Sequence, residues 1–420
     1  MNQLQKQVPQ NKRSDFFMEA KKVYIVAAKR TPVGNFLGTL SGVKPKDMGA
    51  TVVKALLEET GLKGEDIDEV ICGNVLGAGL GQNIGRTIAL EAGIPDSVCA
   101  HTTNMLCGSG MKVVMEGAMS IKTGYNEVVV AGGVESMSQA PYLIPASTRT
   151  GNKMGAWKVE DHMLHDALTD SLYNIHMGVT AENIAQKYSI SRQEQDEFAL
   201  GSQTKAIAAQ DAGKFKDEIV PVVIPSKKGD IVFEADEYPN RGTTLEKLAK
   251  LKPAFIKDGT VTAGNASGIN DGASFVILAS EDAVKKYNLK PLCEIIGYGQ
   301  GGVDPRVMGL GPTPAIRKAL KNAGLKLSDM ELVELNEAFA AQSLGVIHEL
   351  VEEHGVDKAE LMSKTNVNGS AIAIGHPVGI SGNRIIVALI HEMKRTGKKL
   401  GLASLCIGGG QGTAVVIKMV

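Results

Sequence analysis

The stretch Ala55–Val70 reads ALLEETGLKGEDIDEV, and a second stretch, Ala319–Val333, reads ALKNAGLKLSDMELV. When Gly61 is aligned with Gly324, the Leu-Lys pair after each glycine and a later Asp also coincide. Each stretch has the pattern of a helix that ends at a glycine, a short turn and an apolar strand. Two copies of one pattern, far apart in the chain, predict an internal duplication.

A second pair of segments, 109–124 and 381–397, supports the duplication. Each opens with Ser-Gly, continues with helix-like apolar periodicity and closes with Thr-Gly. Each leads into an apolar strand that runs into glycines, Val128–Ala131 in the first half and Leu400–Cys406 in the second. Strands that alternate with helices predict an α/β fold, here two similar layered units packed face to face.

The length and composition of the chain set limits on its class. Its 420 residues favour more than one domain. A net charge of −1 gives no field that would attract nucleic acid, and no apolar run is long enough to span a bilayer. The five cysteines are odd in number, widely spaced and without a CxxC pair. They predict free thiols in a cytoplasmic compartment and no structural zinc.

Four regions follow from these patterns. Residues 1–22 are polar and are expected to form a disordered extension outside the fold. An N-terminal domain is predicted from 23–138 together with about 269–290, and a C-terminal domain from 291–420. The region 139–268 has no counterpart in the second half and reads as an inserted, loop-rich domain. Its two expected helices are Val179–Tyr188 and Arg192–Ala212.

Two residues stand out as candidates for nucleophile and base. Cys107, in NMLCGSG, lies between a strand and a helix, where the helix dipole would favour a thiolate. His376, in AIGHPVG, lies in a rigid loop before a proline. A buried cysteine in a tight turn and a loop histidine bonded to a carbonyl are the alternatives. His162 and His165 lack a third ligand nearby, so no metal is expected there.

Two further positions have an ordinary structural explanation beside a functional one. Cys406 ends a buried strand and precedes Gly408–Gly410, a run that is costly unless the backbone bends sharply or faces a ligand. Asn336 follows the strand Glu331–Leu335, where it would cap a helix or position a water or a carbonyl oxygen.

Taken together, the motifs resemble those of the thiolase family from about Val23 to Val420. The shared segments are NMLCGSGMK, HMGVTAEN, GTVTAGNASGINDGA, NEAFA, GHPVG and SLCIGGGQG, in the family's order. The resemblance implies a duplicated α/β/α/β/α core with an inserted loop domain. It also implies coenzyme A thioesters as substrates and no metal or other cofactor.

The resemblance also implies roles for individual residues. Cys107 would accept the acyl group, His376 would take its proton and Cys406 would act as acid and base on the α-carbon. Asn336 would hold a water in one oxyanion hole, and the N–H groups of Cys107 and Gly408 would form the other. The residues expected to contact coenzyme A or the acyl group are Ser267, Arg241, Leu168, His176, Met177, Phe255, Ala263, Ala338 and Phe339.

Among members of such a family, His176-Met177-Gly178 resembles the short-chain biosynthetic type. Met177 and Phe255 would narrow the acyl pocket, although both could simply fill the core of the loop domain. The expected reaction is therefore the reversible condensation of two acetyl-CoA to acetoacetyl-CoA. A degradative 3-ketoacyl-CoA thiolase and a non-catalytic coenzyme A- or lipid-binding protein are the alternatives. The resemblance further implies a homotetramer built from two dimers.

Overall fold

The computed structural model describes residues 21–420 and contains the predicted duplication. Helix α1 (Pro45–Thr60) ends at Gly61, and helix α8 (Pro312–Ala323) ends at Gly324. Both glycines are left-handed, with φ of 71° and 67°, which glycine adopts without strain. The matching aspartates then bond back to a backbone N–H, at 2.9 Å in the first copy and 2.8 Å in the second. These turns are η1 (Gly64–Asp66) and η6 (Leu327–Asp329).

Each turn leads into a strand that pairs in parallel with the strand after the next long helix. In the first half, β3 (Glu69–Gly73) pairs with β5 (Val128–Ser136), which follows α3 (Ser109–Lys122). In the second half, β12 pairs with β13, which follows α12. These elements are β12 (Leu332–Leu335), α12 (Ser381–Thr396) and β13 (Leu400–Ile407).

The strands of both halves join into one mixed sheet. Within the described residues its order is β12-β13-β14-β11-β1-β10-β5-β3-β4, with β2 paired to β10. The halves meet where β1 pairs with β11 through Tyr24 with Glu294 and Ile25 with Cys293. The two half-sheets are therefore joined edge to edge at β1 and β11. The remaining strands are β1 (Val23–Arg30), β2 (Gly34–Asn35), β4 (Cys99–Thr103), β10 (Asn270–Ser280), β11 (Cys293–Gly302) and β14 (Gln411–Met419).

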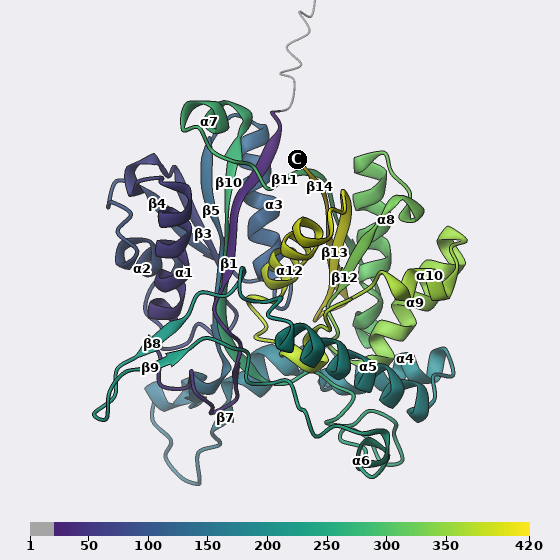
Figure 1. Cartoon of the computed structure of the whole chain (residues 1–420). Coiled ribbons are helices and arrows are strands. Elements are labelled where there is room, and N and C mark those ends of the chain that lie inside the picture. Colours follow the sequence, from purple (N-terminus) through teal and green to yellow (C-terminus); the bar gives the residue numbers. More distant parts are fainter. Residues whose placement is uncertain (1–20) are drawn as a thin grey trace, which may run out of the picture.

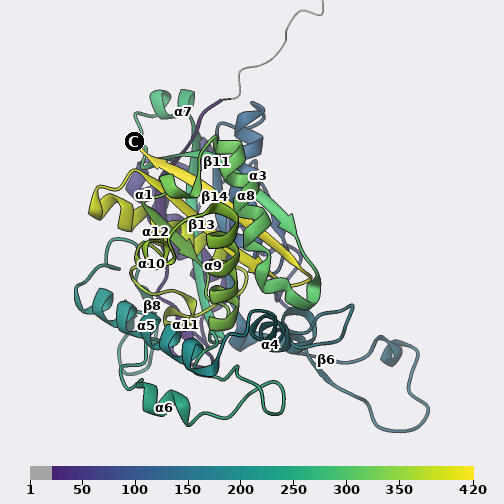
Figure 2. The same ribbon diagram turned by 90° about the vertical axis from the view of Figure 1, so that its right-hand side faces the viewer.

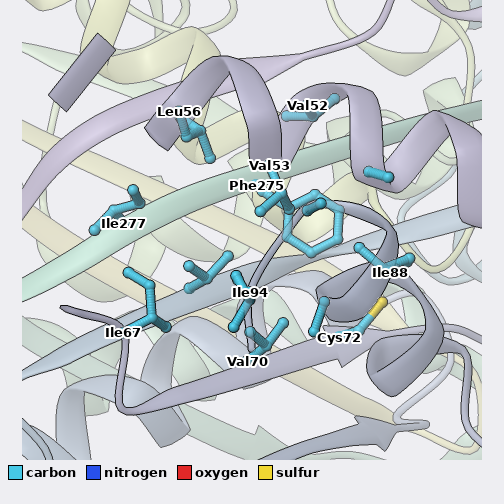
Figure 3. Packing of buried hydrophobic residues seen from close by; sticks show 14 of the residues in the cluster. Val52, Val53, Leu56, Ile67, Val70, Cys72, Ile88, Ile94, Phe275 and Ile277 are labelled. Carbon is cyan, nitrogen blue, oxygen red and sulfur yellow. The ribbon is translucent and has the colours of Figure 1, made fainter. Parts of the chain in front are cut away.

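The predicted α/β/α/β/α layering is confirmed. Helices α3 and α12 contact each other and lie between the two half-sheets (Figure 1). Helices α1 and α2 (Ile84–Glu91) cover the outer face of the first half-sheet, and α8 and α9 (Ala340–His354) cover that of the second. Figure 3 shows the first outer layer, where Val52 and Leu56 of α1 pack near Phe275 of β10. Burying each such side chain stabilises the fold by about 1.5–3 kcal/mol.

The region predicted as a loop domain lies at one end of both half-sheets (Figures 1 and 2). Its two expected helices are present with shifted ends, α4 (Met177–Lys187) and α5 (Arg192–Asp211). The chain then returns to the first half, because β10 lies between β1 and β5. The exact domain boundaries stay predictions, and the predicted extension 1–22 lies outside the described residues apart from Lys21 and Lys22. The small elements here are β6 (Tyr142–Leu143), η3 (Ala146–Arg149), β7 (Glu160–Asp161), η4 (Leu164–Leu168), β8 (Val222–Ile224), β9 (Ile231–Phe233) and α6 (Leu245–Ala249).

The glycines after the two matching strands behave differently. Gly132 and Gly133 lie inside β5 rather than after it. Position 132 requires glycine because a Cβ there would lie 2.4 Å from the Phe275 ring on β10. In the second half, Gly409 and Gly410 have φ of 77° and 81° and turn the chain from β13 into β14. Within residues 21–420, no helix has the length and apolar character needed to cross a bilayer. The other short helices are η2 (Met137–Gln139), α7 (Glu281–Lys286), η5 (Pro305–Leu310), α10 (Lys358–Ser363) and α11 (Ala371–Ile374).

Candidate active site

Cys107 lies in a tight loop between β4 and α3. Ser109 fixes this loop, because its Oγ accepts from the N–H of Met105 at 2.9 Å and donates to the carbonyl of Leu106 at 2.7 Å. Leu106 has φ of 48°, which is strained for a residue other than glycine. The bonds of Ser109 hold the chain in this conformation and set the direction in which Cys107 points.

The loop of Cys107 packs directly on the glycine loop after β13. A Cβ on Gly108 would lie 2.2 Å from Cδ1 of Ile407, and one on Gly408 would lie 2.8 Å from Cδ1 of Leu106. The two loops, which come from different halves of the duplication, meet this closely because both positions are glycine. As a result, the backbone N–H of Gly408 comes near enough to the Cys107 thiol to lower its pKa.

The Cys107 thiol does not have the low pKa that its place before a helix predicted. Burial raises its pKa to about 11, and the N–H groups of Gly408 and of Cys107 itself oppose this only in part. The carboxylate of Glu135 adds a smaller raising effect. The prediction of a resting thiolate is therefore wrong, because the loss of water outweighs the helix N-terminus.

The ring of His376 is held in one tautomer. Its Nδ1 lies 2.6 Å from Oγ of Ser381, and that hydroxyl donates its proton to the carbonyl of Pro377 at 2.9 Å. Ser381 must then accept from His376, so Nδ1 carries the proton. The other nitrogen, Nε2, is buried and has no hydrogen-bond partner within the described residues. His376 thus presents a free lone pair, which is what a general base requires.

His376 is neutral in this state. Burial, together with a smaller effect of the nearby Arg384 guanidinium, lowers its pKa to about 3. The side chain is nearly inaccessible, with 6% of its surface exposed. The predicted nucleophile and base are therefore both uncharged before substrate binds, as a thiol and an imidazole.

Asn336 lies beside this ring but does not cap a helix. Helix α9 begins only at Ala340, which excludes capping, one of the two roles considered for Asn336. Its Nδ2 is 3.5 Å from Nδ1 of His376, and its Oδ1 is 3.5 Å from an Nη of Arg384. Both separations are long for hydrogen bonds. The amide is therefore placed next to the imidazole and retains the capacity to bind another group.

Cys406 is close to Cys107 but lies behind the cavity wall. Its side chain is fully buried at the end of β13, in a cluster with Met177, Ala338 and Phe339. Burial raises the pKa of its thiol, and the neighbouring Cys107 raises it further. The thiol is therefore protonated at rest, and Met177, a neighbour in this cluster, lines the cavity itself.

Cys107 and His376 open into one apolar cavity of about 510 Å³. The volume is in the range that suits a small ligand. Most of the predicted contact residues line it with them, namely Leu168, His176, Met177, Phe255, Ala263, Ser267, Ala338 and Phe339.

One wall of this cavity is formed by three aromatic side chains, those of His176, Phe255 and Phe339. The rings of His176 and Phe255 stack with centroids 4.8 Å apart, and Phe255 meets Phe339 edge to face at 6.0 Å. Nδ1 of His176 caps α4 by accepting from the N–H of Gly178 at 3.0 Å. A Cβ on Gly178 would lie 2.3 Å from the Phe255 ring. The HMG motif therefore places a rigid aromatic wall next to the acyl position.

Ser267 lies in the NASG segment, residues 265–268, just before β10. Its backbone N–H donates to the carbonyl of Ala338 at 2.9 Å, and the next contact along is a bridge between Ala266 and Phe339. These contacts join the NASG segment to the NEAFA segment. Ser267 also lines the cavity.

Arg241 is apart from the other predicted residues. It lines an adjoining cavity of about 730 Å³, and Asn35, Tyr238 and Ala263 border both spaces. Its guanidinium is exposed and pairs with Asp211 at 2.6 Å. A contact between Arg241 and a phosphate therefore stays a prediction, and it would require exchange of this ion pair.

Several residues that shape the site were missed from the sequence. Ser381 and Asn270 hold His376, the latter by accepting from its backbone N–H at 2.9 Å. Glu135 contributes to the raised pKa of Cys107, and Arg384 contributes to the lowered pKa of His376. Ser381 opens the segment that was recognised only as a helix start, so its place five residues after His376 was an available signal. Asn270 and Glu135 act across long chain separations, which a single sequence does not reveal.

Comparison with known proteins identifies the family. A family model described as "Thiolase, N-terminal domain" matches residues 23–282, and one described as "Thiolase, C-terminal domain" matches residues 289–419. An "Acetyl-CoA acetyltransferase" of Chromobacterium violaceum is 53% identical over 398 residues, which cover 94% of this chain and 99% of that protein. A Pseudomonas aeruginosa protein of the same name is 53% identical over 396 residues, covering 94% and 98%.

Two solved structures show the same fold. A crystal structure of the Bacillus anthracis acetyl-CoA acetyltransferase has a TM-score of 0.91 and 46% identity, covering 96% of this chain and 100% of that one. A crystal structure of human mitochondrial 3-ketoacyl-CoA thiolase has a TM-score of 0.90 and 49% identity, covering 95% and 99%. With both family models matched across nearly all of residues 23–419, the chain belongs to the thiolase family.

Proposed function

We propose that this chain is an acetyl-CoA C-acetyltransferase that condenses two acetyl-CoA to acetoacetyl-CoA and coenzyme A, reversibly, through an acetyl-Cys107 intermediate. The observation that carries the proposal is the buried, unpartnered Nε2 of His376, a residue that lines the same cavity as Cys107. The names of the relatives at 53% identity support it. A covalent intermediate divides a difficult condensation into two easier transfers.

In the first transfer, Nε2 of His376 takes the proton of Cys107 as Sγ attacks the thioester carbonyl. The bond from Sγ to the acetyl carbon forms, and the bond from that carbon to the coenzyme A sulfur breaks. Cys406 gives its proton to the departing sulfur and becomes a thiolate. Negative charge on the thioester oxygen would be met by His376 and by a water held at Asn336.

In the second transfer, the Cys406 thiolate removes a proton from the α-carbon of another acetyl-CoA. Its raised pKa makes it a strong base once it is ionised. The carbanion attacks the acetyl-Cys107 carbonyl, whose oxygen would be held by the N–H groups of Cys107 and Gly408. Cys107 leaves and regains its proton from His376, so all three side chains return to their starting state. The scheme assigns every proton and bond to these residues and the two substrates.

The aromatic wall favours a short acyl group. His176, Phe255 and Phe339 are locked by mutual ring contacts, so they would yield little to a longer chain. The pantetheine arm would pass Leu168, Ala263 and Ser267, and the nucleotide would reach the adjoining space near Arg241.

A degradative thiolase with broad chain length is the second candidate, favoured by the 49% identity to human mitochondrial 3-ketoacyl-CoA thiolase. Thiolysis of acetoacetyl-CoA and of a long-chain 3-ketoacyl-CoA separates the two. The proposal expects kcat/KM at least about tenfold higher for acetoacetyl-CoA, since each rejected methylene is worth roughly 1–3 kcal/mol. Equal values, or a preference for the longer substrate, would favour the degradative type. Absence of thiolysis with both would reject an enzyme.

The oligomer and the compartment are further parts of the proposal. Strand β4 is an outer strand of the sheet, and its exposed backbone edge lies just before the Cys107 loop. Such an edge favours pairing with a second copy, and two dimers would form a homotetramer. Light scattering that gives a monomer would contradict this. A cytoplasmic location is proposed from the five free cysteines.

A further inference from the structure

The carboxylate of Glu135 connects the two halves of the chain behind the active site. It lies near the end of β5, in the first half, and none of its side chain is exposed. Its Oε2 accepts from the N–H of Gly379 at 2.9 Å, and Gly379 belongs to the His376 loop of the second half. The same oxygen accepts from the N–H of Val75 at 3.0 Å.

The other oxygen completes the junction. Oε1 accepts from the N–H of Leu76 and from Nδ2 of Asn74, both at 3.1 Å. These residues form the loop after β3, and Val75 and Leu76 pack in the same apolar cluster as Cys107. All four hydrogen bonds of Glu135 in the described structure come from donors, which favours the carboxylate form. Burial opposes this and raises the pKa of Glu135 to about 7.

The chain has adapted to this contact. A Cβ on Gly379 would lie 2.5 Å from Oε2 of Glu135, so a larger residue would separate the carboxylate from the His376 loop. Asn74 is itself fixed by a second bond from its Nδ2 to the carbonyl of Val134 at 3.0 Å. A buried carboxylate is costly unless its hydrogen bonds are satisfied, and here backbone donors from two halves satisfy it together.

We propose that Glu135 is a positioning residue that sets the separation between Cys107 and His376, because one carboxylate holds the His376 loop and the loop after β3, which packs against Cys107. The inference rests on the proposed acyl-transfer function, and it assigns Glu135 no contact with substrate. Proton transfer from Sγ to Nε2 depends steeply on distance, and displacement of about 1 Å can cost about 100-fold in rate. Substrate binding depends on the loop domain and is not expected to change.

The test uses Glu135→Gln. Its NH2 group would face backbone donors, so at least one loop must move. We expect single-turnover acetylation of Cys107 and kcat to fall about 10- to 100-fold, with KM within about threefold. Glu218→Gln is the matched control, because Glu218 is an equally buried carboxylate that pairs with Arg30 elsewhere. The control is expected to lower the melting temperature and leave kcat unchanged.

A second variant and a measurement on the unsubstituted protein keep the inference testable if Glu135→Gln does not fold. Gly379→Ala keeps the charge of Glu135 but displaces it, and it should slow acetylation as well. In the unsubstituted protein, the N–H groups of Gly379, Val75 and Leu76 should be strongly protected from hydrogen exchange.

The inference is overturned if a folded Glu135→Gln or Gly379→Ala protein acetylates Cys107 at the original rate. Rapid exchange of those three N–H groups would overturn it too, whether or not the variants fold. If the unsubstituted protein itself forms no acetyl-Cys107, the proposed function fails instead, so the two failures are distinguishable.

Discussion

Nδ1 of His376 lies 2.6 Å from Oγ of Ser381, and this contact decides which nitrogen of the ring carries the proton. Because Ser381 donates to the carbonyl of Pro377, it can only accept from the ring. The reactive nitrogen, Nε2, is therefore set by a residue that does not itself touch the cavity. The arrangement resembles other sites in which a hydrogen bond at one ring nitrogen fixes the function of the other.

Substitution of Ser381 by Ala should weaken the base without removing it. The imidazole would lose its tautomer and its orientation, so acetylation of Cys107 should slow about tenfold or more, as seen by stopped-flow release of coenzyme A. Ser280→Ala is the control, because Ser280 is fully buried and caps α7 far from the site. Equal rates for Ser381→Ala and the unsubstituted protein would show that the contact does not matter.

The reactivity of Cys107 should depend steeply on pH. With its pKa raised to about 11, the thiolate fraction rises about tenfold for each unit of pH below that value. Alkylation of Cys107 by iodoacetamide should therefore keep accelerating from pH 6 to pH 9 without a plateau. A plateau near neutral pH would instead indicate a resting thiolate–imidazolium pair. Cys107→Ala provides the background rate.

His376 should make the fold less stable in acid. Its pKa is lowered to about 3 in the folded protein from an ordinary 6.5, so the unfolded chain binds the proton more readily. The stabilisation is complete above pH 6.5 and is lost as the pH falls towards 3. Between pH 7 and pH 5 the unfolding free energy of the unsubstituted protein should fall by about 2 kcal/mol more than that of His376→Asn. His348→Asn, at an exposed position, should show no such difference. If denaturant unfolding shows the same fall in unfolding free energy between pH 7 and pH 5 for His376→Asn and the unsubstituted protein, the assigned shift in the pKa of His376 is contradicted.

Shortening Met177 should relax the preference for short acyl groups. Met177 lies between the cavity and Cys406, with its Sδ near Gly408. In Met177→Ala, kcat/KM for a six-carbon relative to a four-carbon 3-ketoacyl-CoA should rise about tenfold. Met154→Ala is the control, since Met154 is 91% exposed. An unchanged ratio would mean that Met177 serves the core of the loop domain only.

Adding a methyl group at Gly408 should disrupt the contact between the two reactive loops. The new Cβ would lie 2.8 Å from Cδ1 of Leu106, so the N–H near the Cys107 thiol must shift. Gly408→Ala should lower kcat about 100-fold, the loss typical of one oxyanion donor. Gly42→Ala, where a Cβ has open space, should leave kcat unchanged. Near-normal kcat in Gly408→Ala would remove Gly408 from the proposed oxyanion site.

The sequence predicted the layers of the fold because their signals are local. Gly61 and Gly324 mark helix ends through their conformational freedom, and apolar periodicity then identifies the following strands. The junction of β1 with β11 could not be predicted, because it depends on how two finished half-sheets meet. The role of Gly132 was misread for the same reason, since the Phe275 ring that requires it comes from a distant strand.

At the site, the sequence predicted which residues gather but not their charge states. Cys107 and His376 were found from their motifs, and the structure brings both to one cavity. Their pKa values depend on how completely water is excluded, which motif position does not report. The supporting contacts of Glu135 cross 59 to 61 residues of chain to the loop after β3 and 244 residues to Gly379.

The most direct test of the central claim is the intact mass of the protein after brief mixing with acetyl-CoA. The account predicts the addition of one acetyl group, located on Cys107 by peptide mapping and absent in Cys107→Ala. Addition of coenzyme A should remove the group and regenerate acetyl-CoA. An unmodified mass under conditions of turnover, or an acetyl group that persists in Cys107→Ala, would contradict the account.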